Sequence, residues 1–288
     1  MSSDNSGSPV AGDDRVRKLA ALEKENRQLR EVVERVNRER IEYLQNVSHQ
    51  LVAPLNAIKW HIENLTNNRV GVERAKKVLR SIYSQSTIAV HLAKNFALMS
   101  NLDADHSLTA LREPLQEVNL FKLLINLADD FQPLGWDKGL KISVVNGNLE
   151  KAPQVLAIKP LLSQAFSNII ENAVKYSNRD TEIVVDGSHN VANDSVSVTI
   201  TNRGIPLSKE DTTKIFDRGH RSAEARNLYP AGTGFGLYIA KRIVEIHKGR
   251  ITARTDAAGR AILEVVLSVR GLEGKTRKRE AKDHSTYR

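Results

Sequence analysis

The chain has 288 residues, of which 40% are hydrophobic and 27% charged, and it carries a formal net charge of +9 with no cysteine. This length gives room for about two domains with cores of their own, and the lack of cysteine excludes disulfides, thiolate metal sites and cysteine nucleophiles. No apolar run approaches the roughly 20 residues needed to cross a bilayer, and the N-terminus is polar rather than signal-like. We therefore expect a cytoplasmic chain without a membrane segment.

The N-terminal part of the chain combines a polar start with a long helix. Residues 1–14 are mostly Ser, Asp, Asn, Gly and Pro, and they are predicted to be disordered because they cannot bury enough apolar surface. Over residues 15–44 apolar side chains recur at spacings of three and four, which predicts a two-stranded coiled coil and hence a homodimer. Asn26 occupies one seam position, where a lone amide commonly fixes register. From Leu44 the seam is shifted by one residue and continues through Leu55 and Ile62, a phase slip that locally rewinds the helices.

Residues 45–103 have the pattern of a helical hairpin. A turn is predicted at residues 67–71, where two asparagines and a glycine end the first helix. A second helix is expected from Val72 to Leu102. Because the apolar face of this hairpin is too broad for one partner, two copies are expected to form a four-helix bundle. Residues 104–116 are predicted to be a linker.

Residues 117–270 predict a separate α/β sandwich domain. The expected helices cover residues 118–131, 160–174 and 235–247. The expected strands cover residues 141–145, 181–185, 196–201, 250–254 and 261–269. The fold class is therefore α+β multidomain. The basic tail at residues 271–288 is expected to be disordered, and no nucleic-acid partner is expected because no aromatic or glycine pattern is interleaved with its charges.

A glycine cluster opens the last predicted helix. Gly232, Gly234 and Gly236 let the backbone approach a phosphate closely, and the N-terminus of the helix offers free N–H donors. The cluster is not a Walker loop, because no Gly-Lys-Ser/Thr follows, and no long parallel βαβ unit supports a dinucleotide site. By itself it fits an ordinary tight turn equally well.

The segment from Asn168 to Ser177 has more specific chemistry. Asn168 and Asn172 are four residues apart and share one helix face. An amide oxygen suits Mg²⁺, which takes its remaining ligands from water and a triphosphate, so Asn172 is the candidate metal ligand. Lys175 lies at the end of the predicted helix, where its ammonium group could reach a phosphate.

Three motifs together resemble the sequence boxes of histidine kinases. Asn-x-x-x-Asn-Ala-x-Lys-Tyr-Ser at residues 168–177 resembles their N box, residues 215–219 are similar to the F box, and residues 232–237 are similar to the second glycine box. Residues 217–231 then fit the mobile lid over ATP. The resemblance implies the ATP-binding fold that gyrase and MutL-type ATPases share, with ATP and Mg²⁺ as cofactors. The residues it implies in ATP binding are Asn168, Asn172, Lys175, Tyr176, Asn202, Gly204, Arg218, Gly232, Thr233, Gly234, Phe235, Gly236 and Leu237.

The first glycine box departs from the family pattern. Histidine kinases usually have Asp-x-Gly-x-Gly there, whereas this chain has Asn-Arg-Gly-Ile-Pro at residues 202–206. Asn202 can accept from the adenine amino group and donate to the adjacent ring nitrogen. It forfeits a charge-assisted bond, on the order of 1 kcal/mol. We therefore expect weaker ATP binding and weaker rejection of GTP.

His49 is the candidate phosphoacceptor. It falls off the apolar stripe of its helix and should face solvent, where a lone histidine is usually without function. However, Ser-His-x-Leu-x-x-Pro-Leu at residues 48–55 resembles the H box of histidine kinases. Near neutral pH the imidazole is largely uncharged and has a free lone pair that can attack a γ-phosphate. The resemblance implies that His49 is both the catalytic nucleophile and the modified residue.

The H box also departs from the commonest family form. Gln50 stands in place of an acidic residue, Val52 in place of a basic one, and Ala53 in place of Thr or Asn. Gln50 can orient the imidazole but cannot take its proton, and a lost general base typically costs about 10²–10⁴-fold where proton transfer limits the rate. A milder loss is expected here because the imidazole is already neutral. Phosphatase activity is expected to be weak or absent.

Other candidates have less specific signals. Gyrase-like ATPases carry a water-activating Glu at the position of Asn168, so fast hydrolysis is not expected, and Glu171 is interpreted as a surface or bundle-facing residue. For three lid residues both a phosphate contact and a solvated loop stay open: Arg218, His220 and Arg221. The tryptophans are expected to be packing residues: Trp60 and Trp136. The other helical histidines are expected to be structural or on helix surfaces: His61, His91 and His247.

The sequence thus predicts the core of a dimeric two-component histidine kinase. It would autophosphorylate on His49 with ATP and Mg²⁺ and pass the phosphoryl group to an aspartate on a response-regulator receiver domain. Residues 15–44 would be its signalling helix, residues 45–103 its dimerisation and phosphoacceptor domain, and residues 117–270 its ATP-binding domain. The alternative is a degenerate pseudokinase that binds nucleotide and serves as a dimeric scaffold.

Overall fold

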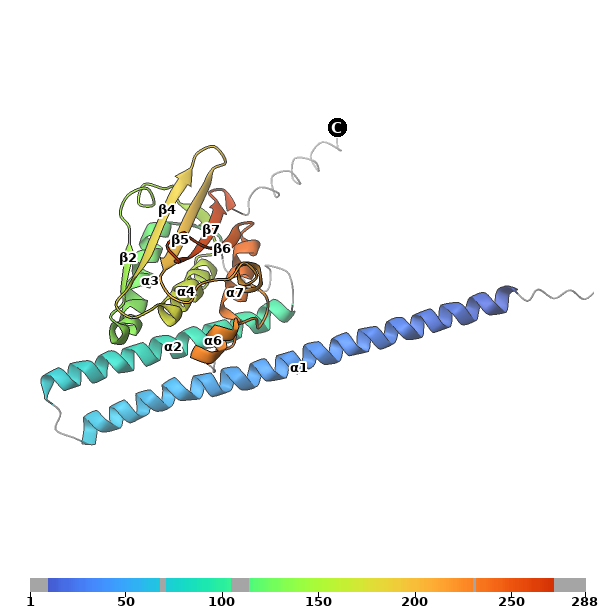
Figure 1. Ribbon diagram of the computed structural model, residues 1–288, viewed down its shortest axis with the longest axis horizontal. Coiled ribbons are helices and arrows are strands. Elements are labelled where there is room, and N and C mark those ends of the chain that lie inside the picture. Colours follow the sequence, from blue (N-terminus) through green and yellow to red (C-terminus); the bar gives the residue numbers. More distant parts are fainter. Residues whose placement is uncertain (1–9, 68–70, 105–113, 230–231, 272–288) are drawn as a thin grey trace, which may run out of the picture. The chain divides into compact units, whose positions relative to one another are not determined.

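The structure is a computed structural model that describes residues 10–67, 71–104, 114–229 and 232–271 (Figure 1). The first nine residues, the middle of the predicted turn, most of the predicted linker and nearly all of the basic tail lie outside the described residues. The chain falls into two compact units, residues 1–48 and residues 49–288. We describe each unit by itself.

The first unit consists of the N-terminal part of helix α1, which spans Val10–Asn67. The helix begins inside the segment predicted to be disordered, because a nucleated helix extends at low cost, one residue at a time. The apolar seam predicted for a coiled coil is exposed in the protomer, with Leu19 62% and Leu29 56% accessible. An isolated helix with such a stripe gains stability only when another surface covers it.

The second unit begins with a helical hairpin. The C-terminal part of α1 is followed by α2, Val72–Ala104, and a hydrogen bond of 2.8 Å between Ser81 Oγ and His61 Nε2 joins the two helices. Leu55 and Ile62, both predicted to lie on the inward seam, are exposed in the protomer.

Both tryptophans contradict the sequence prediction. Trp60 is 60% and Trp136 46% exposed, and the Arg80 guanidinium lies 5.0 Å from the centre of the Trp136 ring. The prediction is wrong because the size of an aromatic side chain does not reveal whether its face of the helix is covered.

The α/β domain is built on a five-stranded sheet with the strand order β2-β4-β5-β7-β6. Its strands are β2 (Lys141–Val144), β4 (Glu182–Asn190), β5 (Ser195–Asn202), β6 (Arg250–Thr255) and β7 (Ala261–Ser268). β2 pairs with β4 in parallel, and the other pairs are antiparallel. Along the central strands β5 and β7, buried residues alternate with partly exposed ones or follow each other directly. Buried side chains such as Val198, Ile200 and Val265 form the core.

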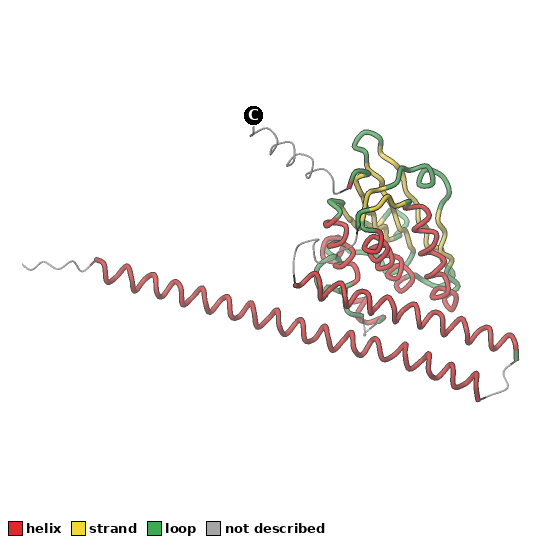
Figure 2. Tube along the Cα trace, turned by 180° about the vertical axis from the view of Figure 1, so that it is seen from behind, coloured by secondary structure: helices red, strands yellow, loops and turns green. Residues whose placement is uncertain are grey.

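Three helices cover one face of this sheet (Figures 1 and 2). They are α3 (Leu120–Gly135), α4 (Lys159–Tyr176) and α7 (Gly236–Ile246). Asn119 caps α3 by accepting a hydrogen bond from the backbone N–H of Lys122, and Pro160 lies in the first turn of α4, where a proline costs no hydrogen bond. The sandwich of one sheet and one helical layer matches the expectation from the sequence.

A buried histidine joins the ends of two of these helices. His247, 1% exposed at the end of α7, accepts a hydrogen bond at Nε2 from the backbone N–H of Ile158, at 3.0 Å. Its Nδ1 lies 2.8 Å from the carbonyl oxygen of Ile243, to which it donates. His247 is therefore held as the neutral tautomer with its proton on Nδ1, and it has the structural role that the sequence left open.

Several short elements were not predicted. β1 (Gln116–Val118) and β3 (Val155–Ala157) pair antiparallel in a separate small sheet. Three-residue strands are too short to show a period, so only their pairing reveals them. The turn-rich outer half of β4 was also missed, because residues such as Asp186 and Gly187 have low strand propensity and are held by pairing with β5.

Candidate functional site

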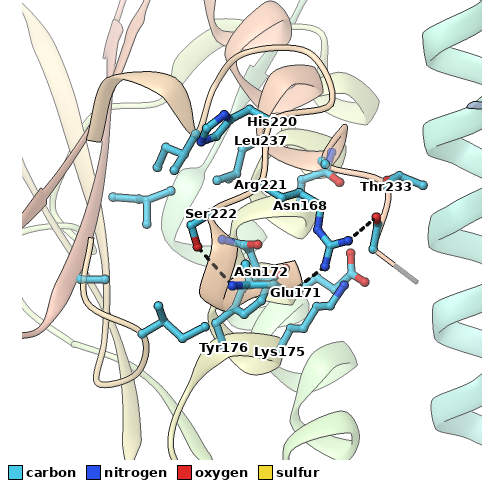
Figure 3. A pocket seen from close by; sticks show the side chains of 18 of the residues that line it. Asn168, Glu171, Asn172, Lys175, Tyr176, His220, Arg221, Ser222, Thr233 and Leu237 are labelled. Atoms are coloured by element: carbon cyan, nitrogen blue, oxygen red, sulfur yellow. Dashed lines mark hydrogen bonds between the residues drawn. The ribbon is translucent and has the colours of Figure 1, made fainter. Parts of the chain in front are cut away.

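A pocket lies between the C-terminal half of α4, the start of α7 and the segment that connects β5 to α7 (Figure 3). Its empty space amounts to about 1080 Å³, a figure that includes volume open to solvent. Its residues come from all the motifs found in the sequence, at residues 168–177, 202–206, 215–219 and 232–237. Ten of the residues predicted to bind ATP line it: Asn168, Asn172, Lys175, Tyr176, Asn202, Gly232, Thr233, Gly234, Gly236 and Leu237.

Three predicted residues support the pocket without lining it. A Cβ on Gly204 would lie 1.9 Å from the carbonyl oxygen of Tyr176, so only glycine lets the end of β5 approach the end of α4. The Arg218 guanidinium lies 5.7 Å from the centre of the Phe235 ring, in cation–π contact. Gly204, Arg218 and Phe235 thus shape the walls of the site.

The end of the pocket that is suited to bind a phosphate is formed by a glycine turn before the N-terminus of a helix. Gly234 has a φ of +73°, and a Cβ there would lie 2.7 Å from the backbone of Gly219. A side chain would therefore be strained both by the backbone conformation and by the close approach. The turn leads into α7, whose first N–H groups have no partner within the helix and favour an anion.

Lys175 contributes a partly desolvated positive charge to the same pocket. Burial lowers the pKa of Lys175, the nearby Glu171 opposes this shift, and the cations of Arg221 and Lys138 add to it. An ammonium group that has lost part of its hydration gains more from a phosphate partner than an exposed one. Asn172, one turn earlier on α4, lines the pocket beside it (Figure 3).

Arg221 ties the segment over the pocket together. Its guanidinium donates to the carbonyl oxygen of Gly232 at 2.8 Å, to that of Ala225 at 2.7 Å and to that of Tyr229. It thereby joins the short helix α6, Ala223–Leu228, to the glycine turn. The sequence left a phosphate contact and a solvated loop open for Arg221, and this bracing role was not predicted.

The apolar end of the pocket has the composition of a slot for a flat ring. Its lining side chains there are Ile205, Leu207, Ile215, Leu237, Ala261 and Leu263. Asn202 lies among them at the end of β5 and is 5% exposed. Its Nδ2 donates to Ser177 Oγ at 3.2 Å, and Ser177 Oγ in turn donates to the carbonyl oxygen of Ala173 at 2.6 Å.

A buried polar network joins α2 to α4 beside the pocket. Asn95 Nδ2 donates to Asn168 Oδ1 at 2.8 Å, Asn168 Nδ2 donates to Asn95 Oδ1 at 3.0 Å, and Gln164 Nε2 donates to Asn95 Oδ1 at 2.8 Å. His91 completes the network, with its Nδ1 3.0 Å from Gln164 Nε2 and its Nε2 3.0 Å from Asn168 Oδ1. The Asn168 amide is thus bonded on both sides to α2, and a nucleotide contact would require it to leave these partners.

Glu171 belongs to the same network. Its Oε2 lies 2.9 Å from His91 Nε2. Burial by itself would raise the pKa of Glu171, but the adjacent His91, by its charge and its hydrogen bond, and Lys175 hold the pKa below its ordinary value. Glu171 therefore faces α2, as one of the two sequence interpretations had it, and its lowered pKa makes it a weaker base for water.

His49 is exposed on α1, as predicted, and the next residue, Gln50, lines the pocket. Successive helical residues point about 100° apart, so the His49 side chain is one step around the helix from the pocket wall. Gln50, the neighbour of the candidate phosphoacceptor, and the glycine turn therefore line the same pocket.

Comparisons with known proteins agree with this geometry. Residues 157–271 match the family described as "Histidine kinase-, DNA gyrase B-, and HSP90-like ATPase". The α/β domain has the fold of the ATP-binding domains of this family. The helical N-terminal region precedes this ATP-binding domain in the chain.

Two curated relatives match a longer part of the chain than this family does. "Sensor histidine kinase WalK" of Bacillus subtilis (strain 168) is 28% identical over 222 residues, which cover 76% of this chain and 35% of the relative. "Sensor protein kinase WalK" of Staphylococcus aureus is 29% identical over 224 residues, which cover 77% of this chain and 52% of the relative. The chain therefore spans about a third to a half of the length of these relatives.

A solved structure described as ShkA full-length in complex with AMPPNP has a TM-score of 0.52 and 21% sequence identity. The match covers 80% of this chain and 46% of that one, and it supports the fold of the helical region and the ATP-binding domain together. In the described part of the chain no helix is long and apolar enough to span a membrane. No group of three or more His, Asp or Glu side chains that could hold a metal occurs among the same residues.

Proposed function

We propose that this chain is the core of a two-component histidine kinase that transfers the γ-phosphoryl group of ATP to His49. The observation that carries the proposal is the position of Gln50, which lines the same pocket as Asn172, Lys175 and the glycine turn. The relatives named as sensor kinases support it. Because these relatives are longer than this chain, the activity of the whole relative is a proposal for this chain.

The chemistry needs positioning and charge neutralisation more than covalent assistance. A lone pair of the His49 imidazole attacks the γ-phosphorus, the N–P bond forms as the bond to the bridging oxygen breaks, ADP leaves, and the imidazole proton passes to water. Gln50 orients the imidazole by accepting from its other ring N–H. Lys175 and the N–H groups of the glycine turn hold the phosphates.

Mg²⁺ fits this site through the nucleotide. In the described residues the pocket has no carboxylate cluster that could hold a metal alone, whereas Asn172 offers an amide oxygen and the triphosphate supplies several more. When bound, the ion would neutralise charge on the phosphates, and Asn172 would fix its place. We assign Asn172 as the protein ligand.

The partners follow from the same proposal. A phosphorylated imidazole is a donor suited to a carboxylate, so we infer a response-regulator receiver domain with an aspartate as acceptor. The exposed apolar seam around Leu19 and Leu29 supports a coiled-coil homodimer.

Labelled ATP tests the proposal. The full chain is incubated with γ-labelled ATP and Mg²⁺, and we expect acid-labile, alkali-stable label that is lost in His49→Ala. His189→Ala on β4 is the matched control and should keep the label. Tight binding of ATP without any label on the wild-type chain would contradict the proposal and favour the pseudokinase alternative.

A further inference from the structure

The orientation of one amide at the apolar end of the pocket is fixed by a neighbouring hydroxyl. Ser177 has a single hydroxyl proton, and it is given to the carbonyl oxygen of Ala173, 2.6 Å away. Toward Asn202 the hydroxyl oxygen can therefore only accept. The Asn202 atom 3.2 Å from it must be the amide nitrogen.

This removes the usual ambiguity of an asparagine. The two ends of an amide have nearly the same shape, so a side chain with a neutral environment can turn over at little cost. Here Asn202 is 5% and Ser177 7% exposed, and the backbone of Asn202 is held by its pairing with Ala261 on β7. Turning the amide would place its oxygen against the Ser177 oxygen, two acceptors without a proton between them.

The position of the amide oxygen, Oδ1 of Asn202, is then fixed as well. Oδ1 of Asn202 accepts no hydrogen bond within the described ranges, and Asn202 lines the pocket among apolar side chains. A ring in that slot therefore meets a hydrogen-bond acceptor. Adenine offers an amino group at its six position, whereas guanine offers a carbonyl oxygen there, which would face Oδ1 as a second acceptor.

We propose that Ser177 is a positioning residue that sets base selection, by holding the Asn202 amide with its oxygen toward the purine. The inference rests on the proposed function only in taking a purine nucleotide as the ligand. It differs from the expectation that a neutral Asn202 rejects GTP weakly, because that expectation requires an amide that is free to turn.

Removing the hydroxyl should release the amide. In Ser177→Ala the Asn202 nitrogen has no partner at that side, and the turned amide can donate to the carbonyl oxygen of guanine. The backbone N–H of Ser177, which donates to Ala173 at 3.0 Å, is unaffected. One neutral hydrogen bond corresponds to about a five- to tenfold change in the preference for adenine over guanine.

The test is equilibrium binding of ADP and GDP with Mg²⁺ to the full chain, by calorimetry. We expect the wild type to prefer ADP, Ser177→Ala to lose about five- to tenfold of that preference, and Ser177→Thr to keep it. In an Asn202→Asp background, Ser177→Ala should leave the ratio unchanged, because both ends of a carboxylate accept. If Ser177→Ala does not fold, Ser177→Cys, whose thiol is a weak acceptor, should show the same loss.

An equal loss of ADP and GDP affinity in Ser177→Ala would overturn the inference, since a merely structural role moves both. So would a ratio that changes equally in the Asn202→Asp background. The outcome is separable from the proposed function. Selective nucleotide binding without label on His49 would contradict the kinase proposal but not the inference on base selection. Normal labelling of His49 with an unchanged ratio of ADP to GDP affinity in Ser177→Ala would contradict the inference but not the kinase proposal.

Discussion

At the scale of single residues, the site combines residues that the sequence predicted with residues whose role is visible only in the folded structure. Asn172, Lys175 and the glycine turn were predicted because each lies in a short contiguous pattern whose spacing has a physical meaning. Arg221 was not predicted to brace the lid, because its partners are backbone carbonyls up to 11 residues away, and backbone groups leave no mark in a sequence.

The lowered pKa of Lys175 predicts that the affinity for ATP depends on pH. Because burial lowers its pKa, the free protein loses this charge at a lower pH than an exposed lysine would. ATP affinity should therefore fall as the pH rises through the lowered pKa, and it should be kept below that pKa. In Lys175→Arg the falling limb should disappear, since a guanidinium stays charged.

The measurement is the ATP dissociation constant between pH 7 and pH 10. Lys175→Ala should lose about tenfold or more in affinity at neutral pH, the value of a charge-assisted hydrogen bond. Identical pH profiles for the wild type and Lys175→Arg would show that Lys175 does not hold the phosphates.

At the scale of helices and strands, the sequence predicted the long elements and missed the contacts between them. α4 and α7 were predicted to within two residues, because proline and glycine mark their ends. The polar network between α2 and α4 was not foreseen. Asn95 and Gln164 are 69 residues apart, and nothing in either helix alone pairs them.

That network makes a prediction about docking of α2 on α4. Asn95→Leu would remove the partner of Asn168 Nδ2 and one hydrogen bond each from Asn168 Oδ1 and Gln164 Nε2. An unsatisfied buried amide group costs about 1–3 kcal/mol if the helices stay together. We expect the helices to separate instead, so that amide hydrogen exchange over residues 159–176 becomes about tenfold faster or more.

Lys94→Ala, at an exposed position on the same helix, is the control and should leave exchange over residues 159–176 unchanged. If Asn95→Leu lowered the global stability while the exchange pattern along α4 kept its wild-type contrast with the rest of the domain, the network would not govern docking.

His247 makes a second prediction for the elements it joins. Burial lowers the pKa of His247, and its hydrogen bond to the Ile243 carbonyl opposes this shift. The unfolded chain then binds a proton more readily than the folded one, so the free energy of unfolding is fully present above the ordinary histidine pKa of about 6.5 and falls as the pH is lowered from there toward the folded pKa.

Urea unfolding between pH 8 and pH 5 measures this slope. Replacing His247 by Gln keeps an acceptor for the Ile158 N–H but removes the titration, so the variant should lose less stability on acidification than the wild type. The difference is at most about 1.4 kcal/mol per pH unit. Equal slopes would mean that His247 takes up its proton as easily in the folded protein as in the unfolded one.

At the scale of the whole molecule, the proposed coiled coil requires two chains. The N-terminal part of α1 leaves Leu22 and Leu29 exposed, and burying a leucine contributes roughly 1.5–3 kcal/mol. The variant with both Leu22→Glu and Leu29→Glu should therefore weaken dimerisation at least a hundredfold, measured by sedimentation equilibrium. Arg27→Glu, on the face of the helix away from the seam, is the control. A wild-type chain that stays monomeric at high micromolar concentration would contradict the coiled-coil proposal.

We propose that the pocket delivers a phosphoryl group to one imidazole, that of His49. The most direct measurement is mass-spectrometric mapping of the modified side chain after incubation of the full chain with ATP and Mg²⁺, at a pH where phosphohistidine survives. We predict the phosphoryl group on His49, and its absence in Asn172→Ala. Phosphate found on another side chain, or ADP released with His49 unmodified, would contradict the account.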